Sequence, residues 1–275
     1  MKRTICTVFT FVLVFGPMLK GCSRQPERNA ADSANATDSA NAADSANAAD
    51  SADAATDDGP SSEIGGVEVE PESGKETPED AIANFEAGIV AYQANDLPLA
   101  YKEFLAASKK GNADSQFNLG LMYEQGIGVG KDEKEAVRWY GESAAQGNAA
   151  AQFNLGVLYE NGRGTKVDFA KANEWYRKAS VQGDPLAIGN LGMLYVRGDG
   201  VKENKVAGMA LLLISATADQ SPENQAKRNI AATRGLTAEM IAAAQALSGE
   251  LSNAKNLLVP LDQYLKESEN SIEKK

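Results

Sequence analysis

The chain has 275 residues, of which 43% are hydrophobic and 24% charged, so it can bury a core in one or two domains. It carries 27 basic and 38 acidic residues, for a net charge of −11 at pH 7. It has no histidine, and its two cysteines are Cys6 and Cys22. This composition excludes the basic surface that nucleic acid requires. It also leaves the sequence after residue 22 without an imidazole base, a thiolate nucleophile or the histidine and cysteine ligands of a soft-metal site.

The negative charge is concentrated in one segment. Residues 1–21 contain three bases and no acid, whereas residues 22–80 contain fifteen acids and three bases. Residues 81–275 contain twenty-three acids and twenty-one bases, and are therefore almost neutral. The overall acidity thus belongs to the sequence that precedes residue 81.

Residues 1–21 have the features of an export signal. Lys2 and Arg3 precede an apolar run of twelve residues that ends at Phe15. A membrane-spanning helix needs about 20 apolar residues, so this run has the length of a signal-peptide core instead. We therefore predict that residues 1–21 are a signal peptide.

The four residues 19–22 read Leu-Lys-Gly-Cys, which resembles the lipobox of bacterial lipoproteins. The resemblance implies that Cys22 is lipidated and becomes the N-terminus. Because Ser23 follows, and not aspartate, it also implies an anchor in the outer membrane facing the periplasm. Lys20 departs from the family pattern, which has a small or neutral residue there. Two alternatives stay open: ordinary cleavage, giving a soluble periplasmic or secreted protein, and an incidental thiol at Cys22.

Residues 22–79 are predicted to be a disordered, acidic, low-complexity linker. A six-residue repeat, Asp-Ser-Ala-Asn-Ala with a final Thr or Ala, begins at Asp32 and continues with one variation to residue 55. The segment has no aromatic residue, so it cannot bury enough apolar surface to offset the loss of chain entropy. A coil of this length spans about 40 Å. It either spaces a domain from a membrane or reflects repeat expansion without a selected length.

A second periodicity, of 36 residues, begins after residue 110. Leu-Gly recurs at 119–120, 155–156 and 191–192, and Gly-x-Gly recurs at 126–128, 162–164 and 198–200. Each unit starts after a glycine, at Gly111, Gly147 and Gly183. Trp-Tyr occurs at 139–140 and 175–176, and is replaced by Leu-Leu at 211–212. Such self-similarity predicts stacked supersecondary units.

Each unit reads as two helices, here called helix A and helix B. An asparagine or aspartate that can cap a helix precedes each of them. The predicted caps are Asn112, Asn148 and Asp184 for helix A, and Asp132, Asp168 and Asn204 for helix B. Between the two helices, the Gly-x-Gly motif provides backbone angles that glycine adopts at low cost.

These residues resemble the Sel1-like repeat, a relative of the tetratricopeptide repeat, and residues 151–183 carry the pattern most fully. The resemblance implies an all-α fold, an α-solenoid (superhelix) of stacked antiparallel helix pairs. Residues 81–110 resemble one further pair, which extends the array to residues 80–219. Residues 220–275 are predicted to be capping helices and a tail. Helices are expected from Ser221-Pro222, from Thr237 to about Leu251, and over 254–267.

The resemblance also implies that the A helices line a concave surface that binds a peptide or protein partner. Asn118, Asn154 and Asn190 recur in one row of that surface, with Glu124 and Glu160 nearby. We predict that these five residues contact the peptide, and that an acidic and apolar groove favours a partner of some basic character. The alternative is that the asparagines bond neighbouring helices to each other.

Trp139 and Trp175 allow two interpretations. They could be stacking platforms for sugars or bases, but their register with alanine and tyrosine in helix B favours packing in the core.

We expect no enzymatic activity, no catalytic residue, no metal and no cofactor. The predicted function is a protein-interaction scaffold in the bacterial cell envelope, without nucleic acid and with membrane contact through the lipid anchor only. Two alternatives stay open: a periplasmic cell-wall-ligand or β-lactam-interacting protein, and an immunity-type lipoprotein that sequesters a toxin or effector. The β-lactam-interacting members of the family carry a cysteine pair in each repeat, which this array lacks.

Overall fold

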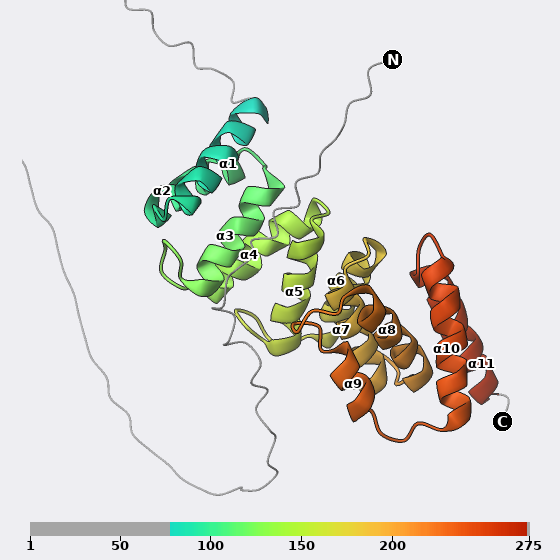
Figure 1. The fold of residues 1–275 in the computed structure, drawn as a ribbon. Helices are drawn as coiled ribbons and strands as arrows, with labels where there is room; N and C mark the ends of the chain where they lie inside the picture. The colour runs from blue at the N-terminus through green and yellow to red at the C-terminus, as the bar shows by residue number, and fades with distance from the viewer. Residues whose placement is uncertain (1–77, 274–275) are drawn as a thin grey trace, which may run out of the picture. The chain divides into compact units, whose positions relative to one another are not determined.

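The computed structural model describes residues 78–273, and every regular element in this range is a helix (Figure 1). The eleven helices are α1 (Pro78–Gln93), α2 (Leu97–Lys109), α3 (Ala113–Gln125), α4 (Glu133–Ala145), α5 (Ala149–Asn161), α6 (Phe169–Val181), α7 (Pro185–Arg197), α8 (Lys205–Ala218), α9 (Ala226–Ala232), α10 (Ala238–Asn253) and α11 (Leu258–Glu273).

The first eight helices form four antiparallel pairs that stack in chain order (Figure 1). Within each pair helix A packs closely on helix B, and each helix B also packs on helix A of the next pair. The prediction of an all-α solenoid of stacked helix pairs is therefore confirmed. The additional pair predicted before the three repeats is formed by α1 and α2.

The helix caps are those predicted. The side chains of Asn112, Asn148 and Asp184 accept the backbone N–H three residues ahead at 2.7–2.9 Å. The caps of α4, α6 and α8 are Asp132, Asp168 and Asn204. At the other end of α3, α5 and α7, a glycine in the left-handed conformation stops the helix, with φ between 67° and 75°. These local signals fix where each helix begins and ends.

Close contact between the two helices of a pair depends on a glycine that faces an aromatic ring. A Cβ on Gly120 would lie 2.5 Å from the ring of Tyr140, and one on Gly156 would lie 2.6 Å from that of Tyr176. Gly88 faces Phe104 at 2.6 Å in the same way. Because no larger residue leaves room for the ring, these glycines set the separation of the helices.

In the pair α7 and α8, a contact between two backbones replaces the contact between a glycine and an aromatic ring. Leu211 and Leu212, which replace Trp-Tyr, are completely buried in α8. A Cβ on Gly208 would lie 2.6 Å from the carbonyl oxygen of Gly192, so here the two backbones face each other directly. The divergent sequence of the third repeat therefore reflects closer packing of the helices.

The segment that follows α8 differs from the prediction. A helix was predicted to start at Ser221-Pro222, but α9 begins at Ala226. The amide of Asn224 donates to the carbonyl oxygens of Ser215 at 2.8 Å and Asp219 at 2.9 Å, and its oxygen accepts the N–H of Ala226 at 2.9 Å. These three bonds hold residues 219–225 as a turn, so the prediction was wrong by four residues.

Helices α10 and α11 cover the end of the core formed by α6, α7 and α8. Leu247, Leu251 and Leu261 are buried in the same cluster as Leu191. Arg177 of α6 holds α11 by two hydrogen bonds to the carboxylate of Asp262, at 2.6 and 2.7 Å. The cap Thr237 of α10 is as predicted, whereas α11 (Leu258–Glu273) both begins and ends later than the predicted residues 254–267. These contacts close an apolar surface that the last repeat would otherwise expose.

The predicted signal peptide, the acidic linker and Cys22 lie outside the described residues, so these three assignments stay predictions. Within residues 78–273, no helix is both long enough and apolar enough to cross a membrane.

Two glycine substitutions test the packing of helix A on helix B. We expect Gly156→Ala to lower the free energy of unfolding by about 1–3 kcal/mol, because its methyl group would overlap the Tyr176 ring. Gly141→Ala is the matched control. It lies inside α4 with no heavy atom within 4 Å of an added Cβ, and should stabilise by about 0.5–1 kcal/mol. Urea unfolding followed by circular dichroism measures both, and equal effects would contradict the packing argument.

Candidate functional site on the A helices

The five residues predicted to bind a peptide belong to α3, α5 and α7, and the side of these helices on which they lie is here called the helix-A surface. The structure brings four of them together in two clusters of the same design. At the centre of each cluster lies a buried tyrosine of helix B, Tyr140 or Tyr176.

The first cluster joins α3, α4 and α5. The hydroxyl of Tyr140 donates to Oε2 of Glu124 at 2.7 Å, and Asn154 hydrogen-bonds the same hydroxyl. Oε1 of Glu124 lies 2.8 Å from Nη1 of Arg163, and Nη2 of the same arginine lies 2.9 Å from Oε1 of Glu133. The guanidinium of Arg163 thus compensates the charge of Glu124, and the phenol of Tyr140 donates a hydrogen bond to it, at the junction between two helix pairs.

The second cluster repeats this arrangement one unit later, between α5, α6 and α7. The hydroxyl of Tyr176 donates to Oε2 of Glu160 at 2.7 Å, and Nδ2 of Asn190 donates to the Tyr176 hydroxyl at 3.1 Å. Here the guanidinium comes from Arg197, whose Nη1 lies 3.6 Å from Oε1 of Glu160. This ion pair is looser than the one in the first cluster.

Asn118 does not take part in such a cluster. The residue one unit before Tyr140 is Phe104, which has no hydroxyl to accept a hydrogen bond. Asn118 is buried, and its amide donates to the carbonyl oxygen of Asp114 in its own helix at 2.8 Å. The three asparagines therefore recur every 36 residues, but Asn118 does not make the tyrosine hydrogen bond that Asn154 and Asn190 make.

These contacts bear on the predicted roles of the five residues. Asn154 and Asn190 bond between neighbouring helices, as the alternative interpretation expected. Glu124 and Glu160 each have an arginine partner, so the surface lacks the uncompensated acidic charge that would favour a basic peptide. Direct contact of these side chains with a peptide stays a prediction.

Apolar side chains lie beside the two clusters. Leu121, Val157 and Met193 occupy the same position of α3, α5 and α7, and each is half-buried. Phe117 and Phe153 lie one turn earlier, and their rings pack 5.8 and 6.0 Å from those of Tyr140 and Tyr176. We call these five residues the apolar stripe. Their inner sides contact the core, and their outer sides face solvent.

The two tryptophans support the core. Trp139 is 5% exposed, as the core interpretation predicted, and the guanidinium of Arg138 lies 3.9 Å from its ring centroid. Trp175 is half-buried against the cluster that contains Tyr140, and Lys178 lies 3.8 Å from its ring centroid. Each ring therefore has a face covered by a cation, and neither forms an open platform for a sugar or a base.

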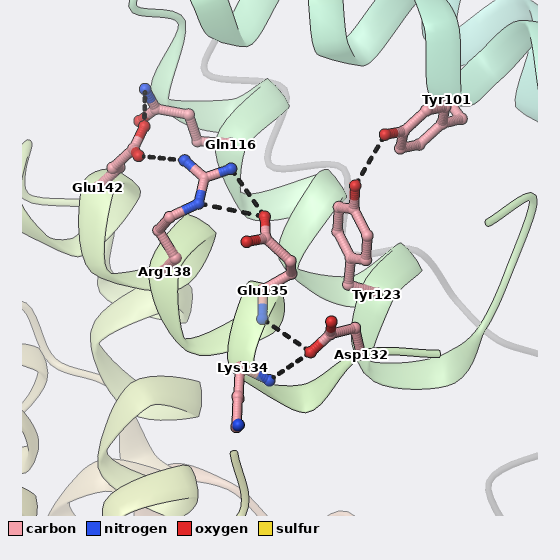
Figure 2. Close-up of polar contacts among 8 residues, drawn as sticks. All are labelled: Tyr101, Gln116, Tyr123, Asp132, Lys134, Glu135, Arg138 and Glu142. Atoms are coloured by element: carbon pink, nitrogen blue, oxygen red, sulfur yellow. Dashed lines mark hydrogen bonds and ion pairs between the residues drawn. The ribbon is translucent and has the colours of Figure 1, made fainter. Parts of the chain in front are cut away.

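One polar junction was not foreseen from the sequence. The hydroxyls of Tyr101 in α2 and Tyr123 in α3 lie 2.7 Å apart (Figure 2). Burial, together with this hydrogen bond, raises the pKa of Tyr123 to about 12. Nearby on α4, Arg138 bridges Glu135 and Glu142. Tyr123 belongs to the repeat pattern but Tyr101 does not, so the periodicity gave no sign of their contact.

The described residues contain no group of three or more histidine, cysteine, aspartate or glutamate side chains placed to hold a metal ion. The two tyrosine clusters instead link neighbouring helices through hydrogen bonds within the fold.

The sequence and structure were compared with known proteins. The Sel1 repeat family model matches residues 113–148, 149–184 and 185–219, so each match begins with the first residue of α3, α5 or α7. A Sel1 repeat protein from Oxalobacter formigenes is 30% identical, with a TM-score of 0.49 over 62% of this chain and 70% of that one. A protective antigen present in uropathogenic Escherichia coli strains is 28% identical, with a TM-score of 0.49 over 69% and 46% of the two chains.

One curated relative is the DAP3-binding cell death enhancer 1 of Rattus norvegicus. It is 46% identical over 46 residues, which are 17% of this chain and 9% of the relative. The likeness is therefore confined to little more than one repeat.

The buried tyrosines make the stability sensitive to alkaline pH. Burial and then the adjacent carboxylate raise the pKa of Tyr140 and Tyr176 well above the ordinary value of 10.0. The folded protein thus retains protons that the unfolded chain releases. The contribution of these two tyrosines to the free energy of unfolding should therefore be constant below about pH 9, and the free energy of unfolding should fall as the pH rises above 10.

Urea unfolding at increasing pH, with tyrosinate absorbance recorded in parallel, checks this expectation. Tyr140→Phe should cost about 1–3 kcal/mol at neutral pH, because it removes a hydrogen bond to a charged group, and should weaken the alkaline dependence. Ionisation of all eight tyrosines near pH 10 without loss of stability would contradict the buried, hydrogen-bonded state of Tyr140 and Tyr176.

Proposed function

We propose that this chain, which carries a Sel1 repeat array over residues 113–219, is a non-enzymatic scaffold that binds a peptide or protein on its helix-A surface. Sel1 repeats generally mediate protein interactions. The observation that carries the proposal is the apolar stripe, because its side chains are exposed on one side at regular 36-residue spacing. Such a row suits an extended or helical segment of a partner.

The structure behind the stripe supports a preformed binding surface. Tyr140 and Tyr176 are fixed by hydrogen bonds to Glu124 and Glu160, and the rings of Phe117 and Phe153 pack on them. A partner therefore meets side chains that have already lost much of their freedom, which lowers the entropic cost of binding.

In this proposal the predicted polar residues play unequal parts. Asn154 and Asn190 hold the surface together and border the stripe, so their amides are the first candidates for polar contact with a peptide backbone. Glu124 and Glu160 contribute mainly by keeping arginines and tyrosines in place. Asn118 is buried and bonded within α3, so it contributes least.

Exchange of one residue in the stripe tests the proposal. The full chain carrying Val157→Lys should recover about tenfold less partner from envelope extracts, because a charge would enter the centre of the apolar contact. Val181→Lys is the matched control: it makes the same change on helix B, where Val181 is 42% exposed. Circular dichroism verifies that both variants fold. Equal recovery by the two variants, or recovery of peptidoglycan fragments only, would count against a protein partner on this surface.

We also propose that the scaffold is anchored in the bacterial envelope through Cys22. The leader pattern of residues 1–22 supports this, and the acidic segment that follows would serve as a spacer between anchor and array.

Metabolic labelling with a palmitate analogue checks the anchor. The wild-type chain should be labelled and should fractionate with membranes, whereas Cys22→Ser should lose the label completely, because the thiol is the acceptor. Cys6→Ser is the control, since a signal peptide is removed before the mature protein is analysed. An unlabelled wild-type chain, or a labelled Cys22→Ser variant, would refute lipidation at this residue.

A further inference from the structure

A hollow of about 350 Å³ lies between the last turn of α7, the turn that follows it and α9. Met193 and Val196 of α7 supply its apolar lining. Arg197, Lys205 and Arg234 bring three cationic side chains to its border, and Glu203 brings the one carboxylate.

The hollow is in line with the apolar stripe. Met193 is itself a stripe residue, in register with Leu121 and Val157. Beyond it, α9 packs on α8 in the position of a further helix A, with Ala226 one unit after Asn190. This helix has seven residues, against 13 in α7, and the chain turns back at Thr233 and Arg234. The short helix leaves space beside the last turn of α7.

The register explains why this hollow is cationic. Val196 stands where the two earlier units have Glu124 and Glu160, each of which pairs with an arginine further along the chain, so the third unit offers no such carboxylate to Arg234. Leu212 likewise replaces the tyrosine that would orient such a carboxylate. The junction between the third unit and α9 therefore has neither the glutamate nor the tyrosine of the earlier clusters, but cationic side chains still line it.

The cations at the hollow have spare hydrogen-bonding capacity. Arg197 lies 3.6 Å from Glu160, and Lys205 lies 3.5 Å from Glu203, both longer than the 2.7–2.9 Å of a tight charged hydrogen bond. Arg234 has no hydrogen bond or ion pair with any residue in the range 78–273. Arg163, by contrast, is bound to two carboxylates at 2.8 and 2.9 Å.

Lys205 and Arg234 both line the hollow. A Cβ on Gly235 would lie 3.2 Å from Nζ of Lys205, which places that ammonium against the residue next to Arg234. Both side chains carry a positive charge at the same hollow, so an anion bound in it would be attracted to each of them.

We propose that this hollow binds the carboxylate of an acidic side chain in a peptide that lies along the apolar stripe. The carboxylate accepts hydrogen bonds from Lys205 and Arg234, and the neighbouring apolar residues of the peptide contact Met193 and Val196. Because α7 and α9 lie on either side of the hollow, the peptide backbone passes over it and inserts a side chain. This inference rests on the proposed helix-A surface and specifies which kind of partner that surface selects.

Three pentapeptides with capped N-termini and otherwise identical apolar sequence test the inference with the full chain; the first two also have capped C-termini. One has a central glutamate, the second a central glutamine, and the third has the glutamine together with a free C-terminal carboxylate. Fluorescence anisotropy at low salt should show the glutamate peptide binding about tenfold more tightly than the glutamine peptide. Lys205→Gln and Arg234→Gln should each reduce that ratio about threefold or more, without weakening the glutamine peptide.

Arg228→Gln is the matched control, because it removes the same charge from an exposed position of α9 that does not border the hollow. Its glutamate preference should remain that of the wild type. Equal binding of the glutamate and glutamine peptides would overturn the inference, as would an equal effect of Arg228→Gln. A preference only for the free C-terminus would show that the hollow takes a chain end, and would also overturn the assignment to a side chain.

The failure of this inference can be told apart from that of the proposed function. If Val157→Lys abolishes partner recovery while the two pentapeptides bind equally, the helix-A surface stands and the carboxylate site does not. If glutamate preference is present while Val157→Lys has no effect on recovery, the hollow stands and the partner binds elsewhere.

Discussion

The stacking of this chain depends on the contact between a glycine of helix A and an aromatic ring of helix B. Gly120 faces Tyr140 and Gly156 faces Tyr176 at separations that exclude any side chain. The contact brings the helices close enough to bury the ring completely, and it leaves the phenolic hydroxyl at the junction with the next pair. A single packing requirement thus determines both the geometry within a unit and the bonding between units.

The hydroxyl at that junction needs partners because it is withdrawn from water. Glu124 and Asn154 satisfy the hydroxyl of Tyr140, and Arg163 then compensates the charge of the glutamate. Helix A, helix B and the next helix A are connected by one cluster, so the position of a repeat is fixed relative to its neighbour. Most of the residues that the sequence predicted to bind a peptide therefore make the hydrogen bonds and ion pairs that hold neighbouring repeats together.

The ends of the array depart from this design in ways that bear on binding. At the first unit Phe104 has no hydroxyl, and Asn118 turns to its own helix. At the last unit Leu212 and Val196 remove the tyrosine and the glutamate, and α9 is too short to fill the space beside α7. The same substitutions that end the polar clusters therefore leave the cationic hollow at the end of the apolar stripe, where specificity for a partner can arise.

The sequence by itself determined the helix pairs, their caps, their stacking order and the repeat family, because glycine, asparagine and aspartate act through local backbone geometry that recurs every 36 residues. The tertiary structure alone decided which polar side chains are engaged in hydrogen bonds and ion pairs within the fold. It showed that the hydroxyls of Tyr101 and Tyr123 meet, that Asn224 delays α9, and that arginines neutralise the glutamates. Such contacts join residues whose spacing follows no period. They depend on how helices pack in space, and that cannot be read from any one repeat.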